Sequence, residues 1–175
     1  MEIERFDLLY YENHYQDGRC TMKVEDAVMC LSESTDKYIM ELVPDDHNPL
    51  CKRKVFDAAT LCLASEGMYL AKSILKVGVW KDYDTDGNVV NQTDYDVDYP
   101  LKWEQVASIL KAEGVGYDDI KVIHRSVNQD RKPQWNFMIL RNSDTIENVI
   151  IDAVDGTIIE WDKKRSKSEY RPTNQ

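Results

Sequence analysis

The sequence predicts an α+β fold, in which helices pack on an antiparallel β-sheet. Apolar residues recur at helical spacing in two segments, residues 54–75 and 101–113. Runs that alternate between apolar and polar residues follow the second segment, at 120–127, 135–139 and 149–153. Because an alternating run buries one face of its strand, these runs are expected to share a core with the helices. The length of 175 residues suits one compact domain or two small fused parts.

The segment after Pro100 is the clearest predicted helix. Its apolar residues stand three or four positions apart, which places them on one helical face: Trp103, Val106, Ala107 and Leu110. Pro100 suits a first helical position because its missing N–H would be unpaired there in any case, and Gly114 can take the left-handed conformation that ends a helix. After the alternating runs, Asp155 and Gly156 are expected to close a hairpin with residues 157–161 as the return strand.

The order of these elements resembles the PepSY family. The resemblance rests on a short helix, a Pro-x-Trp sequence entering a central strand and an Asp-Ala-x-x-Gly turn: Val106, Ala107, Pro133, Gln134, Trp135, Asp152, Ala153, Asp155 and Gly156. It implies an α+β unit at residues 99–162, with a helix and hairpins forming a curled antiparallel sheet. Such units occur in the pro-regions of secreted peptidases and in envelope proteins, where they inhibit or hold a partner. The family supplies no catalytic residues.

The N-terminal part, residues 1–98, is also expected to mix helices and strands, and residues 163–175 form a basic, flexible tail. Predicted in the N-terminal part are strands at 3–11, 19–24 and 38–43, a short helix at 25–31, the main core helix at 54–75, and two runs, 77–80 and 89–90, that flank a turn.

Charge and hydropathy limit the partners. The formal net charge is −10 and the pI is near 4.8, so nucleic acid and anionic membranes would be repelled, whereas a basic protein surface would be attracted. The first residues carry acidic side chains where a secretory signal would carry Lys or Arg. No run approaches the roughly 20 apolar residues that span a membrane. The sequence therefore predicts a cytoplasmic protein.

The predicted binding site is an acidic run without a lysine or arginine. Its carboxylates are Asp82, Asp84, Asp86, Asp94, Asp96 and Asp98. We expect these carboxylates, or an aromatic surface, to engage a basic protein partner in a binding or inhibitory role. The oligomeric state is left open.

A calcium site is the alternative reading of the same run. Asp82, Asp84 and Asp86 alternate as oxygen ligands do in a calcium loop, and Gly87 permits the sharp bend. Thr93 stands where the pattern needs a bidentate Glu. A β-hairpin with its tip at residues 85–88 is favoured over a calcium-stabilised structural module, and no other cofactor is expected.

Catalytic motifs are missing from the sequence, which favours a non-enzymatic function. It has no glycine-rich phosphate loop, no G-x-S-x-G and no H-E-x-x-H. The four cysteines, Cys20, Cys30, Cys51 and Cys62, contain no C-x-x-C pair and are read as small buried apolar residues. A small enzyme with a carboxylate or cysteine site that leaves no linear motif remains the alternative.

Overall fold

A computed structural model describes residues 3–16, 19–141 and 145–165. The chain divides into two compact units, Met1–Val97 and Asp98–Gln175. Each unit is built on one antiparallel sheet whose strands pair in chain order. The protein is therefore mainly β, and each unit is described by itself.

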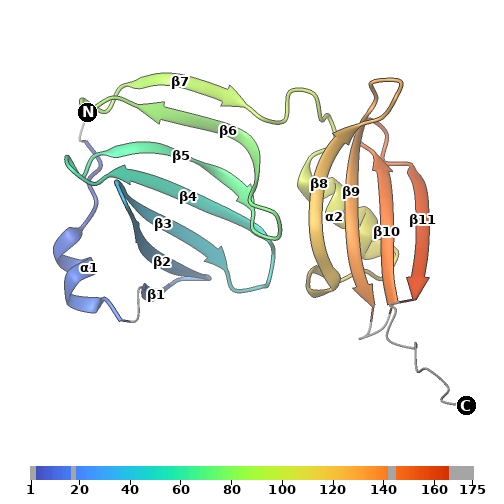
Figure 1. The fold of residues 1–175 in the computed structure, drawn as a ribbon, viewed down its shortest axis with the longest axis horizontal. Helices are drawn as coiled ribbons and strands as arrows, with labels where there is room; N and C mark the ends of the chain where they lie inside the picture. The colour runs from blue at the N-terminus through green and yellow to red at the C-terminus, as the bar shows by residue number, and fades with distance from the viewer. Residues whose placement is uncertain (1–2, 17–18, 142–144, 166–175) are drawn as a thin grey trace, which may run out of the picture. The chain divides into compact units, whose positions relative to one another are not determined.

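The first unit is a seven-stranded meander with one short helix (Figure 1). Its elements are α1 (Leu8–His14), β1 (Cys20–Val24), β2 (Ala27–Ser34), β3 (Lys37–Pro44), β4 (Leu50–Asp57), β5 (Leu63–Leu70), β6 (Leu75–Tyr83) and β7 (Val89–Asp94). Each strand pairs with the next, so β1 and β7 are the two edges of the sheet. The edges matter because an edge strand carries backbone N–H and C=O groups that no neighbouring strand uses.

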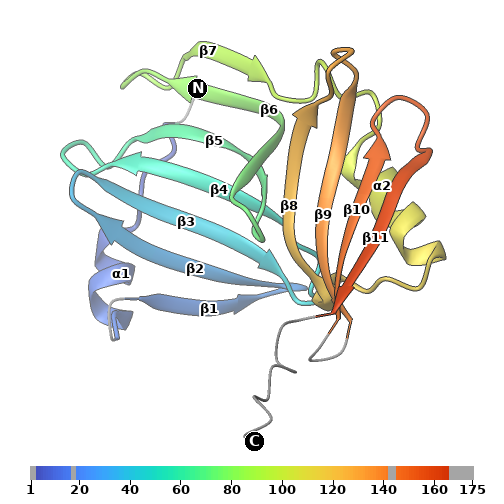
Figure 2. The same cartoon turned by 45° about the vertical axis from the view of Figure 1, so that its right-hand side comes forward.

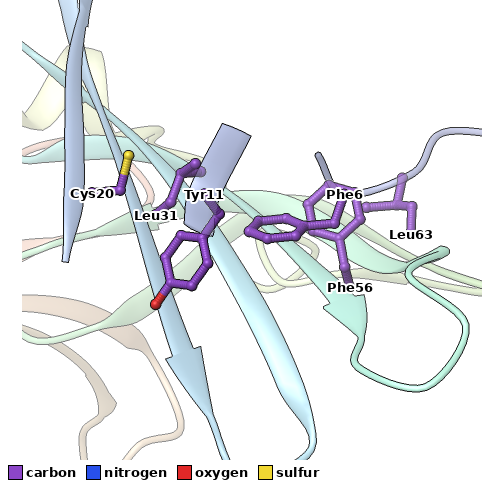
Figure 3. Packing of buried hydrophobic residues seen from close by; sticks show 6 residues of the cluster. All are labelled: Phe6, Tyr11, Cys20, Leu31, Phe56 and Leu63. Carbon is purple, nitrogen blue, oxygen red and sulfur yellow. The ribbon is translucent and has the colours of Figure 1, made fainter. Parts of the chain in front are cut away.

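The main core of the first unit lies where α1 meets the sheet. Figure 3 shows its buried members, Phe6, Tyr11, Cys20, Leu31, Phe56 and Leu63. The Phe6 ring stacks on Tyr38 with ring centroids 4.5 Å apart. The helix begins after Asp7, whose carboxylate accepts a hydrogen bond from the Tyr10 N–H at 2.8 Å. This cap positions Tyr11 to fill the core.

A second, smaller cluster joins Cys51, Tyr69 and Trp80. The Trp80 ring lies against Gly67, and its Nε1 donates a hydrogen bond to the Met68 carbonyl oxygen at 2.8 Å. The Lys76 ammonium lies 4.1 Å from the centroid of the Trp80 ring. The bare backbone of Gly67 is therefore what lets an indole lie flat on the sheet.

The second unit places helix α2 along one face of a four-stranded sheet (Figure 2). Its elements are α2 (Trp103–Ala112), a short 3-10 helix (Tyr117–Asp119), β8 (Ile120–Val127), β9 (Pro133–Arg141), β10 (Thr145–Asp152) and β11 (Ile158–Arg165), in the sheet order β11-β10-β9-β8. The core includes Trp135, which is fully buried and donates from Nε1 to the Leu101 carbonyl oxygen at 3.1 Å. Strands β8 and β11 are the edges.

A polar network ties α2 to the sheet. The Arg141 guanidinium donates hydrogen bonds to the carbonyl oxygens of Gly114 at 2.8 Å and Glu113 at 3.0 Å, which end the helix. The same side chain lies 3.5 Å from the carboxylate of Glu147, which is buried and also accepts from Trp161 Nε1 at 2.7 Å. Arg141 thus links the end of α2 to two strands.

The predicted α+β fold is wrong for the chain as a whole, because the structure is mainly β with two α-helices among the described residues. The predicted core helix at 54–75 forms parts of β4 and β5 and the turns around them. The Asp57 carboxylate accepts hydrogen bonds from the Ala59 and Thr60 N–H groups, which turns the chain, and Leu61 follows at φ 60°. Both strands carry apolar side chains on two faces, and the periodicity of such a segment does not distinguish it from a buried helix.

Other segments are corrected in the same way. Residues 25–31, predicted as a helix, are the turn before β2 and its first residues, and the predicted strand at 3–11 contains the start of α1. The helix expected after Pro100 and the strands that follow it are present as α2 and β8 to β11. The predicted tail at 163–175 begins inside β11, and residues 166–175 lie outside the described residues.

Candidate functional site

The candidate site is the outer edge of β7. Among the described residues this strand pairs only with β6, where Thr93 lies opposite Trp80 and Asn91 opposite Asp82. All six of its residues are exposed. A strand that is exposed on both faces and along one edge is a template on which a further strand can pair.

Hydrogen bonding to β6 fixes which backbone groups face outward. The Tyr95 N–H donates to the Gly78 carbonyl oxygen at 2.9 Å, so Tyr95 and, two residues earlier, Thr93 face β6. In an antiparallel ladder the intervening residues point their N–H and C=O groups the other way. Gln92 and Asp94 therefore present donors and acceptors at the open edge.

The edge lacks two of the residue types that commonly prevent strand addition, lysine and proline. The sequence of β7, VVNQTD, contains no lysine, arginine or proline. Two of its apolar side chains lie in solvent, Val89 at 49% and Val90 at 63% exposure. Sequence reasoning placed Val89 and Val90 beside a turn and missed the open edge, although a strand without lysine or proline was a usable signal.

The six predicted aspartates do not form one cluster. Asp86, Asp94 and Asp98 are exposed, Asp82 and Asp84 are half-buried, and Asp96 is buried. Besides Asp84, two of them hold local structure: Asp82 accepts from Asn91 Nδ2 at 3.0 Å, and Asp94 accepts from the Asp96 N–H at 2.9 Å. Five of the six carboxylates stand before or after β7 in the chain, and Asp94 is its last residue.

Asp84 organises the tip of the β6–β7 hairpin. Its Oδ1 accepts hydrogen bonds from the N–H groups of Asn88 at 2.8 Å and Asp86 at 3.0 Å. These bonds from Asn88 and its neighbours hold the pKa of the Asp84 carboxyl below its usual value. Along the described ranges, no three His, Cys, Asp or Glu side chains gather where they could hold a metal ion. The tip forms the hairpin turn that the sequence favoured over a calcium loop.

A pH effect follows from the bonds to Asp84. The pKa of the Asp84 carboxyl is lower in the folded protein than in the unfolded chain, where it is about 4. The ionised carboxyl therefore stabilises the folded tip fully above about pH 4, and this stabilisation is lost as the pH falls through the lower, folded pKa. We expect the Asn88 amide to lose its protection from hydrogen exchange over that window. In the Asp84→Ala variant the amide should be unprotected at every pH; equal protection in the two proteins would contradict this role.

The cysteines do not form a reactive site. Cys20, Cys51 and Cys62 are buried, and Cys30 is half-buried. Burial raises the pKa of the thiols of Cys30 and Cys51, which keeps both in the poorly nucleophilic protonated form. A surface hollow of about 400 Å³ lies beside Cys62, but the two carboxylates that line it, Asp57 and Asp84, are engaged in turns.

Aromatic side chains mostly serve the cores. Trp80, Trp103, Trp135 and Tyr11 are buried, whereas Tyr15 and Tyr95 are exposed at 48% and 38%. Tyr15 packs against Tyr11 beside α1, and Tyr95 packs against Trp80 after β7.

Comparison with known proteins gives little likeness. No protein-family model and no curated protein matches the chain. One similar solved structure is a candidate lipoprotein from Clostridium difficile 630, with 12% sequence identity, a TM-score of 0.33, and coverage of 90% of this chain and 89% of that one. In the described part of the chain, no helix is long and apolar enough to cross a membrane.

These comparisons correct two predictions. The PepSY resemblance is wrong, because no family model matches and the chain is built mainly from two meandering sheets rather than from a PepSY unit. The predicted cytoplasmic location is withdrawn as well, because the comparison gives it no support: the similar solved structure is described as a candidate lipoprotein. A TM-score of 0.33 transfers neither that protein's location nor its role to this chain.

Proposed function

We propose that this protein is a non-enzymatic binding or inhibitory protein that adds an extended, basic strand of a protein partner to the open edge of β7. The observation that carries the proposal is the edge itself, where Gln92 and Asp94 face away from β6. Backbone hydrogen bonds of a pairing strand provide affinity without a preformed pocket.

The charge around β7 selects the partner. Between residues 82 and 98 the chain carries six aspartates and no lysine or arginine. Carboxylates stand in the chain before β7, at Asp86, and at its end, at Asp94, so a basic strand meets acidic groups whichever way it runs. Opposite charge speeds encounter and disfavours acidic partners, and the effect is screened by salt.

The proposal predicts that a proline in β7 strongly weakens peptide binding. Gln92→Pro removes an outward N–H and obstructs a further strand, while the inward bonds at Asn91 and Thr93 to β6 remain. With a fluorescent peptide of alternating Lys and Val, we expect affinity to fall about tenfold or more, as for one or two lost hydrogen bonds plus a steric block.

The matched control is Gln92→Ala, which keeps the backbone N–H and should bind the peptide within about twofold of the natural protein. A Glu-Val peptide of equal length should not bind, and high salt should weaken the Lys-Val complex. Equal affinities for the proline and alanine variants, with both shown to be folded by circular dichroism, would mean that the β7 edge is not the site.

A further inference from the structure

The chain has a second open edge strand, β11, and positively charged residues lie at its end. Strand β11 ends the four-stranded sheet and, within the part of the chain that the structure describes, pairs only with β10. Residues 162–175 contain five Lys or Arg and two Asp or Glu, and Lys163 is an exposed member of β11. The chain therefore carries one edge strand in an acidic segment and one that leads into a basic segment.

Backbone geometry also leaves β11 ready to pair. The Ala153 N–H donates to the Pro133 carbonyl oxygen at 3.0 Å, and the Asp152 N–H donates to the Thr157 carbonyl oxygen at 2.8 Å. Odd residues of this segment therefore bond toward β9 and even residues toward β11. Because Asn148 lies opposite Asp162, the neighbouring Trp161 and Lys163 present their N–H and C=O groups at the free edge.

We propose that the strand received by β7 is β11 of a second copy of this chain. The inference rests on the proposed function and names its partner. β7 pairs with β6 in one sheet and β11 pairs with β10 in the other, so among the described residues each strand is an edge of its own sheet. Pairing of two β7 edges would oppose carboxylates such as Asp94, and pairing of two β11 edges would oppose cations such as Lys163. Only the mixed pair is complementary.

Strand β8, the other edge of the second sheet, fits β7 less well. Of its two cationic side chains, Arg125 lies 4.1 Å from the ring centroid of Trp135 and 4.6 Å from that of Tyr99. Its charge is thus held against aromatic rings. Asp118 and Asp119 precede the strand and would repel an acidic edge. β11 also carries two acidic residues, Glu160 and Asp162, but three consecutive cations, Lys163, Lys164 and Arg165, follow them in the same strand.

A contact between unlike edges is heterologous and has a distinctive consequence. After one β7–β11 contact has formed, the pair of copies still has one unused β7 edge and one unused β11 edge, so a further copy can join. Such contacts produce open chains or closed rings rather than a dimer that stops growing. The assembly should grow with protein concentration and shrink with added salt.

Sedimentation velocity over a range of concentrations tests the inference. The natural protein should form a series of species larger than the monomer at low salt. Gln92→Pro and Lys163→Pro should each stay monomeric alone, with the association constant reduced about tenfold or more. An equimolar mixture of the two variants should form a heterodimer and nothing larger, because each supplies the one edge that the other lacks. Gln92→Ala and Lys163→Arg, which keep the backbone N–H and, at position 163, the positive charge, should assemble like the natural protein.

The outcomes separate this inference from the proposed function. If the natural protein stays monomeric at low salt while the Lys-Val peptide still binds at β7, the self-association is wrong and the proposed function stands. If the peptide also fails to bind, both are wrong. Assembly that persists in the folded proline variants, or a mixture that grows beyond the heterodimer, would likewise overturn the β7–β11 contact. Should Lys163→Pro fail to fold, the salt dependence of the natural protein and the Gln92→Pro variant still decide the question.

Discussion

Replacing Gly67 with alanine is expected to destabilise the first unit by about 3 kcal/mol, at the upper end of the range for overpacking a filled site. A Cβ at this position would lie 2.3 Å from Cδ2 and 2.4 Å from Cγ of Trp80. The indole has little freedom to retreat, because its Nε1 is bonded to the Met68 carbonyl oxygen and Lys76 lies over the ring. Urea unfolding followed by circular dichroism measures the loss.

Two variants make this prediction specific. Gly78 lies in the neighbouring strand β6, at φ 60°, and a Cβ there would meet nothing within 4 Å. Gly78→Ala should therefore cost only the backbone strain, about 1 kcal/mol. Combining Gly67→Ala with Trp80→Leu should cost less than the sum of the single changes, because the smaller side chain makes room. Strict additivity would show that the clash with Trp80 is not the cause.

Replacing Arg141 with methionine is expected to destabilise the second unit by about 3 kcal/mol, because it leaves the charge of buried Glu147 poorly compensated. Glu147 would keep its hydrogen bond from Trp161 and a cation, Lys163, at 3.7 Å, whose own side chain is 68% exposed. The carbonyl oxygens of Glu113 and Gly114 would also lose their side-chain donor at the end of α2.

Removing the charge of Glu147 is the matched test. Glu147→Gln keeps an oxygen that can accept from Trp161 Nε1, so in the Arg141→Met background it should recover part of the lost stability. Thermal unfolding of the natural protein, both single variants and the double variant gives the coupling energy. If the double variant lost the full sum of the two single effects, Arg141 and Glu147 would not act as a pair.

The sequence predicted elements well where one face of a segment is polar and poorly where both faces are apolar. Helix α2 was predictable because Trp103, Val106 and Leu110 share one face and the exposed face is polar. Strands β4 and β5 were missed because their apolar residues cover both faces, and periodicity does not separate such strands from a buried helix. The decisive information was local: the Asp57 turn and Gly67, which accepts an indole from β6.

The candidate site was only half predictable. The acidic character of residues 82–98 follows directly from composition, and the turn at Asp84 follows from its Asp-Gly-Asn context. The burial of Asp96 and the outward direction of Gln92 depend on the strand register, which a single sequence does not specify. An edge strand is defined by the neighbour it lacks, so it is visible only once the sheet order is known.

Amide hydrogen exchange of β7, measured with and without the Lys-Val peptide on dilute protein, tests the central claim most directly. In the free protein the Thr93 amide, which faces β6, should be protected, and the Gln92 amide should exchange freely. Peptide binding should protect Gln92 and leave Thr93 unchanged. A Gln92 amide that is already protected in the free monomer, or that stays unprotected when peptide is bound, would contradict an open β7 edge that receives a basic strand.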